Sequence, residues 1–523
     1  MVIQDEWTAA REAERRSKYH EADVIVVGAG ILGCAAAYAL AEQGRSVLLL
    51  ERWMHEPDRI VGELLQPGGV EALRRLGLAD CLEGIDAIPC YGYHVLFHEE
   101  DLVFPYPETD AGGNVRAIVR KNTGARDYVH PQTNGSANSS GKRQTRSSEG
   151  RSFHHGRLIM KLRGKCLAHR NITVVETEVT RLVRAEKWPQ VLGVEANTVV
   201  DRETGKKRAD CFFGQLTIVA DGYASKFRDE IVGRKPVVRS KFYGLELIDC
   251  PMPPYGFPHV VIGDAAPILL YQIGTHETRA LFDVPHDLPA ASAKAGGVRN
   301  YIENVAMPAL PEPVRPSVRA ALADGRIPKS MPNSYLPAAA PRPDRHPGVL
   351  LLGDALNMRH PLTGGGMTVA FHDALLLAEL LSPDRVPNLG DTVAVGKALR
   401  SLHWRRKRLS SIINVLAQAL YSLFSARSDD RQMVALQRGC FEYFRRGFTD
   451  EPLGLMGGIL HRPLVLAYHF FSVAFLAIWL ETKKMCFSNV FGIFLLPLAV
   501  VDAVLILWRA CVVFLPVVWT ELQ

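Results

Sequence analysis

The sequence predicts an α/β fold: a Rossmann-like βαβ domain, an interleaved α+β domain and a helical, membrane-associated region at the C-terminal end. Three observations predict it. An apolar strand meets a glycine-rich turn at 23–33, a second apolar strand meets a lone carboxylate and three glycines at 350–367, and two long apolar runs follow residue 463. Glycine turns of this kind are typical of a backbone that approaches phosphate groups closely.

The first element is a strand, helix and strand unit. Residues 24–27 are predicted to form a buried strand, 31–43 a helix, and 46–50 a second strand that ends in Glu51. A carboxylate at this position can accept hydrogen bonds from a ribose diol. The unit therefore predicts dinucleotide binding, with NAD and FAD both open.

The turn inside this unit has the spacing G-x-G-x-x-G. Gly28 permits the tight turn, Gly30 lets a pyrophosphate approach the backbone, and Gly33 lets the helix pack against the strand. Because a strand precedes the turn and a helix follows it, the context agrees with the motif.

The second glycine turn distinguishes between the two dinucleotides. Gly353-Asp354 follows the apolar strand 349–352, and Gly364-Gly365-Gly366 opens a helix predicted at 368–381. A second acidic site is not needed for NAD, but it suits the ribityl and pyrophosphate portion of FAD. The isoalloxazine ring is then expected over the turn 361–367, with the helix N-terminus near its electron-rich edge. FAD is the predicted cofactor.

Composition and these motifs divide the chain into segments. The expected segments are a polar N-terminal stretch (1–22), an FAD-binding domain in three parts (23–110, 152–235 and 341–385), a disordered polar insertion (111–151), a strand-rich substrate domain (236–340), a helical region (386–462) and membrane-associated helices (463–523).

Charge and cysteine usage exclude several functions. The net charge of +6 is mild and the basic residues are dispersed, apart from a cluster at 403–408, so nucleic-acid binding is not expected. An anionic membrane surface is the predicted partner of that cluster. The nine cysteines are scattered without a C-x-x-C pair, which predicts neither a disulfide scaffold nor a metal site.

The apolar runs 463–480 and 487–519 approach the length needed to cross a bilayer. Pro497, Pro516, Asp502 and Arg509 argue against simple spanning, because charges at the bilayer centre are costly. A monotopic anchor or shallow hairpin is predicted. A pair of buried helices in a soluble domain is the alternative.

The chain also resembles a known family. The G-x-G-x-x-G turn, Asp221-Gly222 and Gly353-Asp354 together are similar to the aromatic-hydroxylase-like flavin monooxygenases. Four longer motifs, at 56–69, 153–157, 220–228 and 357–368, resemble the squalene monooxygenase (squalene epoxidase) family, and the polar insertion resembles its fungal type. The similarity runs from about Asp23 to the end of the sequence, without the insertion.

The resemblance implies an activity and a location. Squalene epoxidases convert squalene to (3S)-2,3-oxidosqualene in sterol (ergosterol) synthesis, using FAD, O2 and electrons from NADPH delivered by NADPH-cytochrome P450 reductase. A flavin C4a-hydroperoxide transfers the oxygen, so neither a nucleophilic side chain nor a metal is required, but water must be excluded. The expected location is the endoplasmic reticulum membrane, facing the cytosol, with lipid droplets as a second place.

The resemblance also implies site residues. FAD contacts are expected at Ile31, Leu32, Glu51, Arg52, Arg59, Leu64, Arg157, Asp354 and Met367, beside the glycines named above. Asp221 is linked to FAD and pyridine nucleotide in the wider class, although a strand-end turn explains it equally well. Tyr93 is expected near the flavin, hydrogen-bonded to Gln66, and the substrate tunnel is expected at Tyr271, Pro361, Leu362, Phe424, Phe441 and His469.

Three other functions stay open. The chain is alternatively a flavin hydroxylase of an aromatic or polyketide substrate, a flavin-dependent isoprenoid reductase that works without oxygen, or a non-catalytic membrane scaffold. The product formed from squalene, and its dependence on oxygen, distinguishes them.

Overall fold

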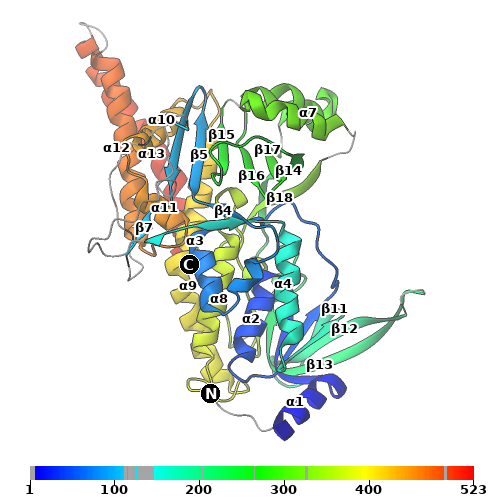
Figure 1. Cartoon of the computed structure of the whole chain (residues 1–523). Coiled ribbons are helices and arrows are strands. Elements are labelled where there is room, and N and C mark those ends of the chain that lie inside the picture. Colours follow the sequence, from blue (N-terminus) through cyan, green and yellow to red (C-terminus); the bar gives the residue numbers. More distant parts are fainter. Residues whose placement is uncertain are drawn as a thin grey trace, which may run out of the picture.

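Two seven-stranded sheets, two small sheets and a helical region make up the described part of the chain (Figure 1). The computed structural model describes residues 6–110, 115, 122, 124–125, 146–201, 204–263, 265–286, 288–323, 328–487 and 492–522. Most of the expected disordered insertion, 111–151, lies outside the described residues. The polar N-terminal stretch carries a helix, α1 (Glu6–Lys18).

The first sheet contains the predicted βαβ unit. Its order is β10-β2-β1-β13-β12-β11, with β19 beside β13. The strands are β1 (Glu21–Val27), β2 (Val47–Glu51), β10 (Ile172–Glu176), β11 (Glu178–Arg184), β12 (Val191–Asp201), β13 (Lys206–Val219) and β19 (Val349–Leu351). β1, β2, β10 and β19 run parallel to their neighbours, and such strands read as continuous apolar runs because both faces are covered.

Helices cover this sheet and bury its apolar runs. They are α2 (Ile31–Ala41), α3 (Pro67–Arg75), α4 (His155–Ala168) and α8 (Gly366–Leu380). Together with the strands they form one core cluster, which includes Val26, Leu49 and Phe371. The predicted strands and helices of the cofactor domain are thereby confirmed, with ends that differ by a few residues.

The second sheet has the order β18-β14-β17-β16-β15-β5-β6. Its strands are β5 (Gly92–Phe97), β6 (Glu100–Pro105), β14 (Val237–Ile248), β15 (His259–Ile262), β16 (Ile268–Gln272), β17 (Glu277–Pro285) and β18 (Lys329–Tyr335). One face packs against the helical region, and α6 (Gly297–Tyr301) and α7 (Arg315–Ala323) cover the other. The expected strand-rich region is present, and it takes β5 and β6 from within the segment 23–110.

The helical region consists of α9 (Thr392–Phe424), α10 (Arg431–Arg445), α11 (Asp450–Met456), α12 (Pro463–Phe487) and α13 (Leu496–Leu522). α12 and α13 are long and apolar enough to cross a membrane, and only 22% and 28% of their most apolar stretches are buried. Asp502 and Arg509 of α13 are paired with α10 and the residue before it: Asp502 lies 3.2 Å from Arg431, and Arg509 contacts Asp430.

The basic cluster at 403–408 is only partly available to a membrane surface: Arg406 and Lys407 are buried, whereas Trp404 and Arg408 are exposed, so its contact with a membrane stays a prediction. Arg406 is buried and forms a two-bond ion pair with Asp373 of α8, at 2.9 and 2.7 Å. Lys407 is buried and donates to the Glu521 carbonyl oxygen at 2.6 Å. Both cations are thus paired with acceptors inside the protein, as a buried charge must be to be stable.

Candidate flavin and substrate site

A cavity of about 230 Å³ lies between the two sheets, where β1, β13 and β19 end. The carboxyl ends of parallel strands are the usual place for a nucleotide. Predicted site residues that line it are Gly30, Ile31, Leu32, Arg59, Leu64, Tyr93, Tyr271, Gly353, Asp354, Pro361, Leu362, Gly366 and Met367. The sequence therefore predicted much of its wall.

The first glycine turn has the geometry that its motif predicts. Gly28 has φ +99°, and an added Cβ would lie 2.6 Å from the Ala220 carbonyl oxygen. A Cβ on Gly33 would lie 1.8 Å from the Gly28 carbonyl oxygen, so α2 approaches the strand closely. A Cβ on Gly30 would meet nothing within 4 Å. This open backbone in the cavity wall fits a phosphate group.

Glu51 at the end of β2 holds the glycine turn. Its Oε2 accepts from the Ala29 amide at 2.7 Å, its Oε1 accepts from the Trp53 amide at 3.1 Å, and Arg163 lies 3.4 Å away. Neither Glu51 nor Arg52 is among the cavity-lining residues. The Arg52 guanidinium lies over the Trp53 ring, 4.1 Å from its centroid.

The second glycine turn closes the opposite wall. Gly353 has φ +64° and begins a short 3-10 turn that places Asp354 at the cavity. A Cβ on Gly366 would meet nothing within 4 Å, whereas one on Gly365 would lie 2.4 Å from Ile413 Cγ2 of α9. Gly366 thus leaves open backbone at the N-terminus of α8, which suits an anionic group, and Gly365 permits helix packing.

Two predicted residues near this wall, Asp221 and Arg59, each have a buried polar atom without a hydrogen-bond partner. Asp221 accepts the Lys226 amide at 3.0 Å through Oδ2, while its buried Oδ1 has no partner. This geometry is that of a strand-end turn, the alternative given for Asp221, and the adjacent Gly222 lines the cavity. The Arg59 Nε is also buried without a partner. Such unpaired groups beside the cavity fit a polar ligand.

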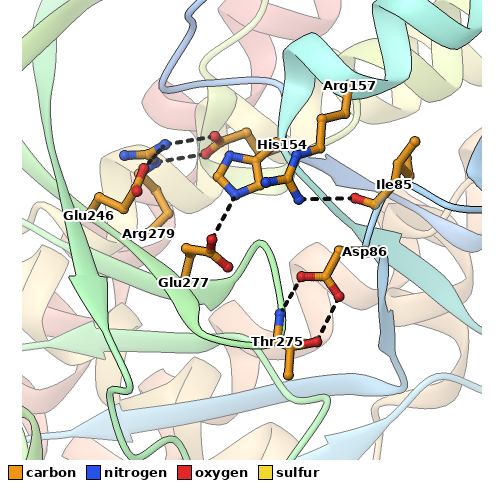
Figure 2. Close-up of polar contacts among 9 residues, drawn as sticks. Ile85, Asp86, His154, Arg157, Glu246, Thr275, Glu277 and Arg279 are labelled. Carbon is orange, nitrogen blue, oxygen red and sulfur yellow. Dashed lines mark hydrogen bonds and ion pairs between the residues drawn. The ribbon is translucent and has the colours of Figure 1, made fainter.

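Arg157 lies in a charged cluster at the junction of α4 and the second sheet (Figure 2). Its guanidinium lies beside the His154 ring and donates to the Ile85 carbonyl oxygen at 3.4 Å. Asp86 accepts from the amide and hydroxyl of Thr275 in the same view, at 2.7 and 2.6 Å. Arg157 is not among the residues that line the cavity.

Tyr93 and Gln66 form the predicted hydrogen bond. Gln66 Nε2 donates to the Tyr93 hydroxyl oxygen at 2.5 Å and to the Thr363 carbonyl oxygen at 2.6 Å, and Tyr106 donates to Gln66 Oε1 at 2.5 Å. Burial raises the pKa of Tyr93 to about 12. The phenol is therefore neutral at physiological pH, and its hydroxyl is fixed at the cavity wall.

Two smaller cavities of about 90 Å³ each, called here the second and the third, adjoin the first one after the other through shared wall residues. The first and second share Tyr93, Val260 and Leu362 in their walls. The second and third share Leu416, Leu420, Cys440, Phe444 and Pro452. The walls are mostly apolar, and the third cavity reaches α12 and α13.

The predicted substrate residues are distributed along these three cavities. Tyr271 and Pro361 line the first, Leu362 the first and second, Phe424 and Phe441 the second, and His469 the third. His469 Nδ1 lies 2.7 Å from the Tyr443 hydroxyl, and its Nε2 lies 2.9 Å from Glu451.

A buried ion pair at the first cavity was missed from the sequence. Glu63 lines the cavity and binds Arg279 of β17 through two hydrogen bonds of 2.9 Å, and Tyr271 donates to Glu63 at 3.3 Å. Burial raises the pKa of Glu63, and the ion pair with Arg279 opposes this shift. The only signal was that Glu63 lies within the motif 56–69, since its partner is distant in sequence.

Comparisons with known proteins agree with this geometry. A family model described as FAD dependent oxidoreductase matches residues 23–352. The flavin-dependent brominase Bmp2 superposes with a TM-score of 0.60 at 14% identity, covering 86% of this chain and 98% of that one. HpxO of Klebsiella pneumoniae, solved with FAD and uric acid, gives a TM-score of 0.56 at 19% identity, covering 84% and 97%. The fold and the cavity thus define an FAD-dependent oxidoreductase.

Closer relatives define the family. A family model described as squalene epoxidase matches residues 213–494. The squalene epoxidase of Gibberella zeae is 60% identical over 514 residues, which cover 98% of this chain and 98% of that protein. The squalene monooxygenase of Mus musculus is 38% identical and covers 99% and 81%. The chain belongs to the squalene epoxidase family: it is an FAD-dependent squalene monooxygenase of sterol synthesis.

Proposed function

We propose that FAD occupies the first cavity and that squalene extends from there through the second and third cavities. The observation that carries this proposal is the row of three cavities with shared wall residues. A long hydrocarbon requires such an elongated, apolar space. One end of the substrate then lies beside the turn 361–367, where the flavin ring is expected. The other end lies near the apolar helices α12 and α13.

Residues on both sides of the first cavity would hold the cofactor. The open backbone at Gly30 and the N-terminus of α8 would face its phosphates, and Asp354 would face its ribityl hydroxyls. Bound FAD supplies the electron transfer and oxygen activation that amino-acid side chains do not.

The protein's own side chains would orient the alkene and keep water out. Tyr93 and Leu362 belong to the walls of both the first and the second cavity, so they lie where the substrate would meet the flavin. Gln66 fixes the Tyr93 hydroxyl through its hydrogen bond. Exclusion of water protects reactive oxygen species from unproductive decay.

The family resemblance supports the finer assignments. The product is (3S)-2,3-oxidosqualene, the electrons come from NADPH through NADPH-cytochrome P450 reductase, and the enzyme faces the cytosol from the endoplasmic reticulum membrane. The apolar helices α12 and α13 support attachment to a membrane.

A tryptophan placed between the second and third cavities tests the substrate path. Leu420 lines both, so Leu420→Trp should obstruct the path and raise the KM for squalene about ten-fold, a typical cost of overpacking. FAD content and flavin reduction by the reductase should not change. The matched control is Val393→Trp, because Val393 is 79% exposed on the same helix, α9. A wild-type KM in Leu420→Trp would exclude this path.

A further inference from the structure

The last described turn of α13 points one side chain, Glu521, into the molecule, although Trp519 and Leu522 beside it are exposed. Glu521 is 3% exposed. Its carboxylate accepts from Ser411 at 3.0 Å and from Asn414 at 2.8 Å, both on α9, and its carbonyl oxygen accepts from Lys407 at 2.6 Å. The preceding Thr520 lies 3.0 Å from the Tyr335 hydroxyl. Figure 1 shows this end of the chain beside α9.

A series of hydrogen bonds leads from Glu521 to residues 357–359, which follow β19 at the wall of the first cavity. The Asn414 side-chain amide donates to Glu521 and also lies 3.3 Å from Asn357 Oδ1. Asn357 Oδ1 in turn accepts from the Arg359 guanidinium at 2.5 Å. Arg359 lines the first cavity, beside Asp354.

Donors and acceptors alternate consistently along this chain of contacts. Asn357 Nδ2 donates to the Leu336 carbonyl oxygen at 2.8 Å, which turns its Oδ1 toward Asn414 and Arg359. Asn357 and Asn414 are both fully buried. In such a dry environment, a connected polar network fixes the orientation of its members, and the loss of one partner leaves the others unsatisfied.

We propose that Glu521 is a positioning residue for the flavin site. It acts through Asn414 on Asn357, whose side-chain oxygen holds the Arg359 guanidinium in the cavity wall. The inference rests on the proposed placement of FAD in the first cavity. As a consequence, the position of α13, one of the two apolar helices, affects the geometry of residues 357–359 at the first cavity.

FAD affinity of the purified full-length protein tests the proposal. Glu521→Ala should weaken FAD binding about ten-fold or more and shift the visible absorption bands of the bound flavin, because it removes a buried, charge-assisted acceptor. Glu521→Gln keeps an acceptor for Asn414 and should stay within about three-fold of wild type. Glu481→Gln on α12 is the control for a carboxylate of the apolar helices and should have no effect.

Asn414→Ser interrupts the same network from α9. It should reproduce the affinity loss and spectral shift of Glu521→Ala, and the double variant should be little worse than either single one, since coupled residues are non-additive. Asn414→Ser also decides the question if Glu521→Ala does not accumulate. Circular dichroism and sedimentation with membranes verify folding and attachment.

Four results would contradict the proposal, and one of them points to the placement of FAD itself. Wild-type FAD affinity and spectrum in both Glu521→Ala and Asn414→Ser would overturn the positioning role, as would additive losses. An equal loss in Glu521→Gln and Glu521→Ala would also contradict it, because the acceptor would then not matter. If Asp354→Asn keeps its flavin as well, the placement of FAD in the cavity is wrong, and not only the role of Glu521.

Discussion

At the scale of single residues, Asp354 is the carboxylate that follows the second glycine-rich strand end and that we expect to face the cofactor. It lines the first cavity, while its backbone carbonyl is held by Arg228 at 3.0 Å. Asp354→Asn removes the charge and leaves this backbone contact in place. We expect the FAD dissociation constant to rise about ten-fold or more, as charged hydrogen bonds are worth about 1.5–3 kcal/mol.

Titration of the apoprotein with FAD measures this change by flavin fluorescence. The control is Asp344→Asn, an exposed carboxylate ahead of the same strand. Undiminished FAD affinity in Asp354→Asn would remove the carboxylate from the cofactor site.

Tyr93 should affect turnover more than cofactor binding. Tyr93→Phe removes the hydroxyl that Gln66 holds at the cavity wall, and kcat should fall about ten-fold with the FAD content unchanged. Because the pKa of Tyr93 is about 12, its phenol is protonated throughout the range of about pH 6 to 10. The shape of the pH–rate profile in this range should therefore be the same in both proteins.

Tyr301→Phe serves as the control for Tyr93, because Tyr301 is a buried tyrosine of α6 on the other face of the second sheet. A wild-type kcat in Tyr93→Phe, or loss of FAD from it, would argue against the assigned role.

At the scale of elements, the exposed faces of α12 and α13 should attach the enzyme to the membrane. Leu464 and Phe475 on α12, and Val504 and Trp508 on α13, are each 59–85% exposed. Each such side chain is worth about 1.5–3 kcal/mol when it leaves water. Replacing all four by serine should move the protein to the soluble fraction after centrifugation, with its FAD retained.

A matched variant changes four exposed apolar residues elsewhere to serine: Trp188, Val199, Val237 and Ile248. It should remain with the membranes. A four-serine variant of α12 and α13 that still sediments with membranes would show that another surface attaches the enzyme. Substitution is preferable to deletion, because α12 and α13 bury Ala474, Ala477 and Ile506 against α10.

Local patterns predicted those elements whose burial is continuous. β1, β2, β19 and α8 were found within a few residues because parallel strands covered on both faces appear as apolar runs, and glycines mark the turns beside them. The pairing of β5 with β15 was not predictable, since it joins segments far apart in sequence. The internal partners of Arg406 and Lys407 were not predictable for the same reason, because Asp373 and Glu521 lie on other helices.

The residues of the candidate site likewise fall into those that the sequence predicted and those that it did not. The roles of Gly28, Gly30 and Gly33 followed from spacing and steric requirements, and the contact of Tyr93 with Gln66 followed from family resemblance. Glu63 and Arg279 carry no pattern that would reveal their pairing, because it depends on how the two sheets meet. The sequence thus indicated the two glycine turns and one contact between the domains, Tyr93 with Gln66, but not the ion pair of Glu63 with Arg279.

At the scale of the whole molecule, the fold places the first cavity between two sheets, and two apolar cavities with shared wall residues lie between it and two exposed apolar helices. This arrangement suits a water-insoluble substrate that reaches the enzyme from a membrane. It does not suit a small phenolic substrate, which would need polar groups along the path. The second and third cavities therefore favour epoxidation of a hydrocarbon over hydroxylation of an aromatic ring.

The most direct test is the fate of oxygen in a single reaction. The purified holoenzyme is incubated with squalene, NADPH, NADPH-cytochrome P450 reductase and ¹⁸O₂, and the product is analysed by mass spectrometry, with Asp354→Asn as the flavin-poor control. We expect (3S)-2,3-oxidosqualene that carries one ¹⁸O atom, and no product without oxygen. Hydrogenated squalene formed in the absence of oxygen, or no product from squalene with the flavin fully bound, would contradict the account.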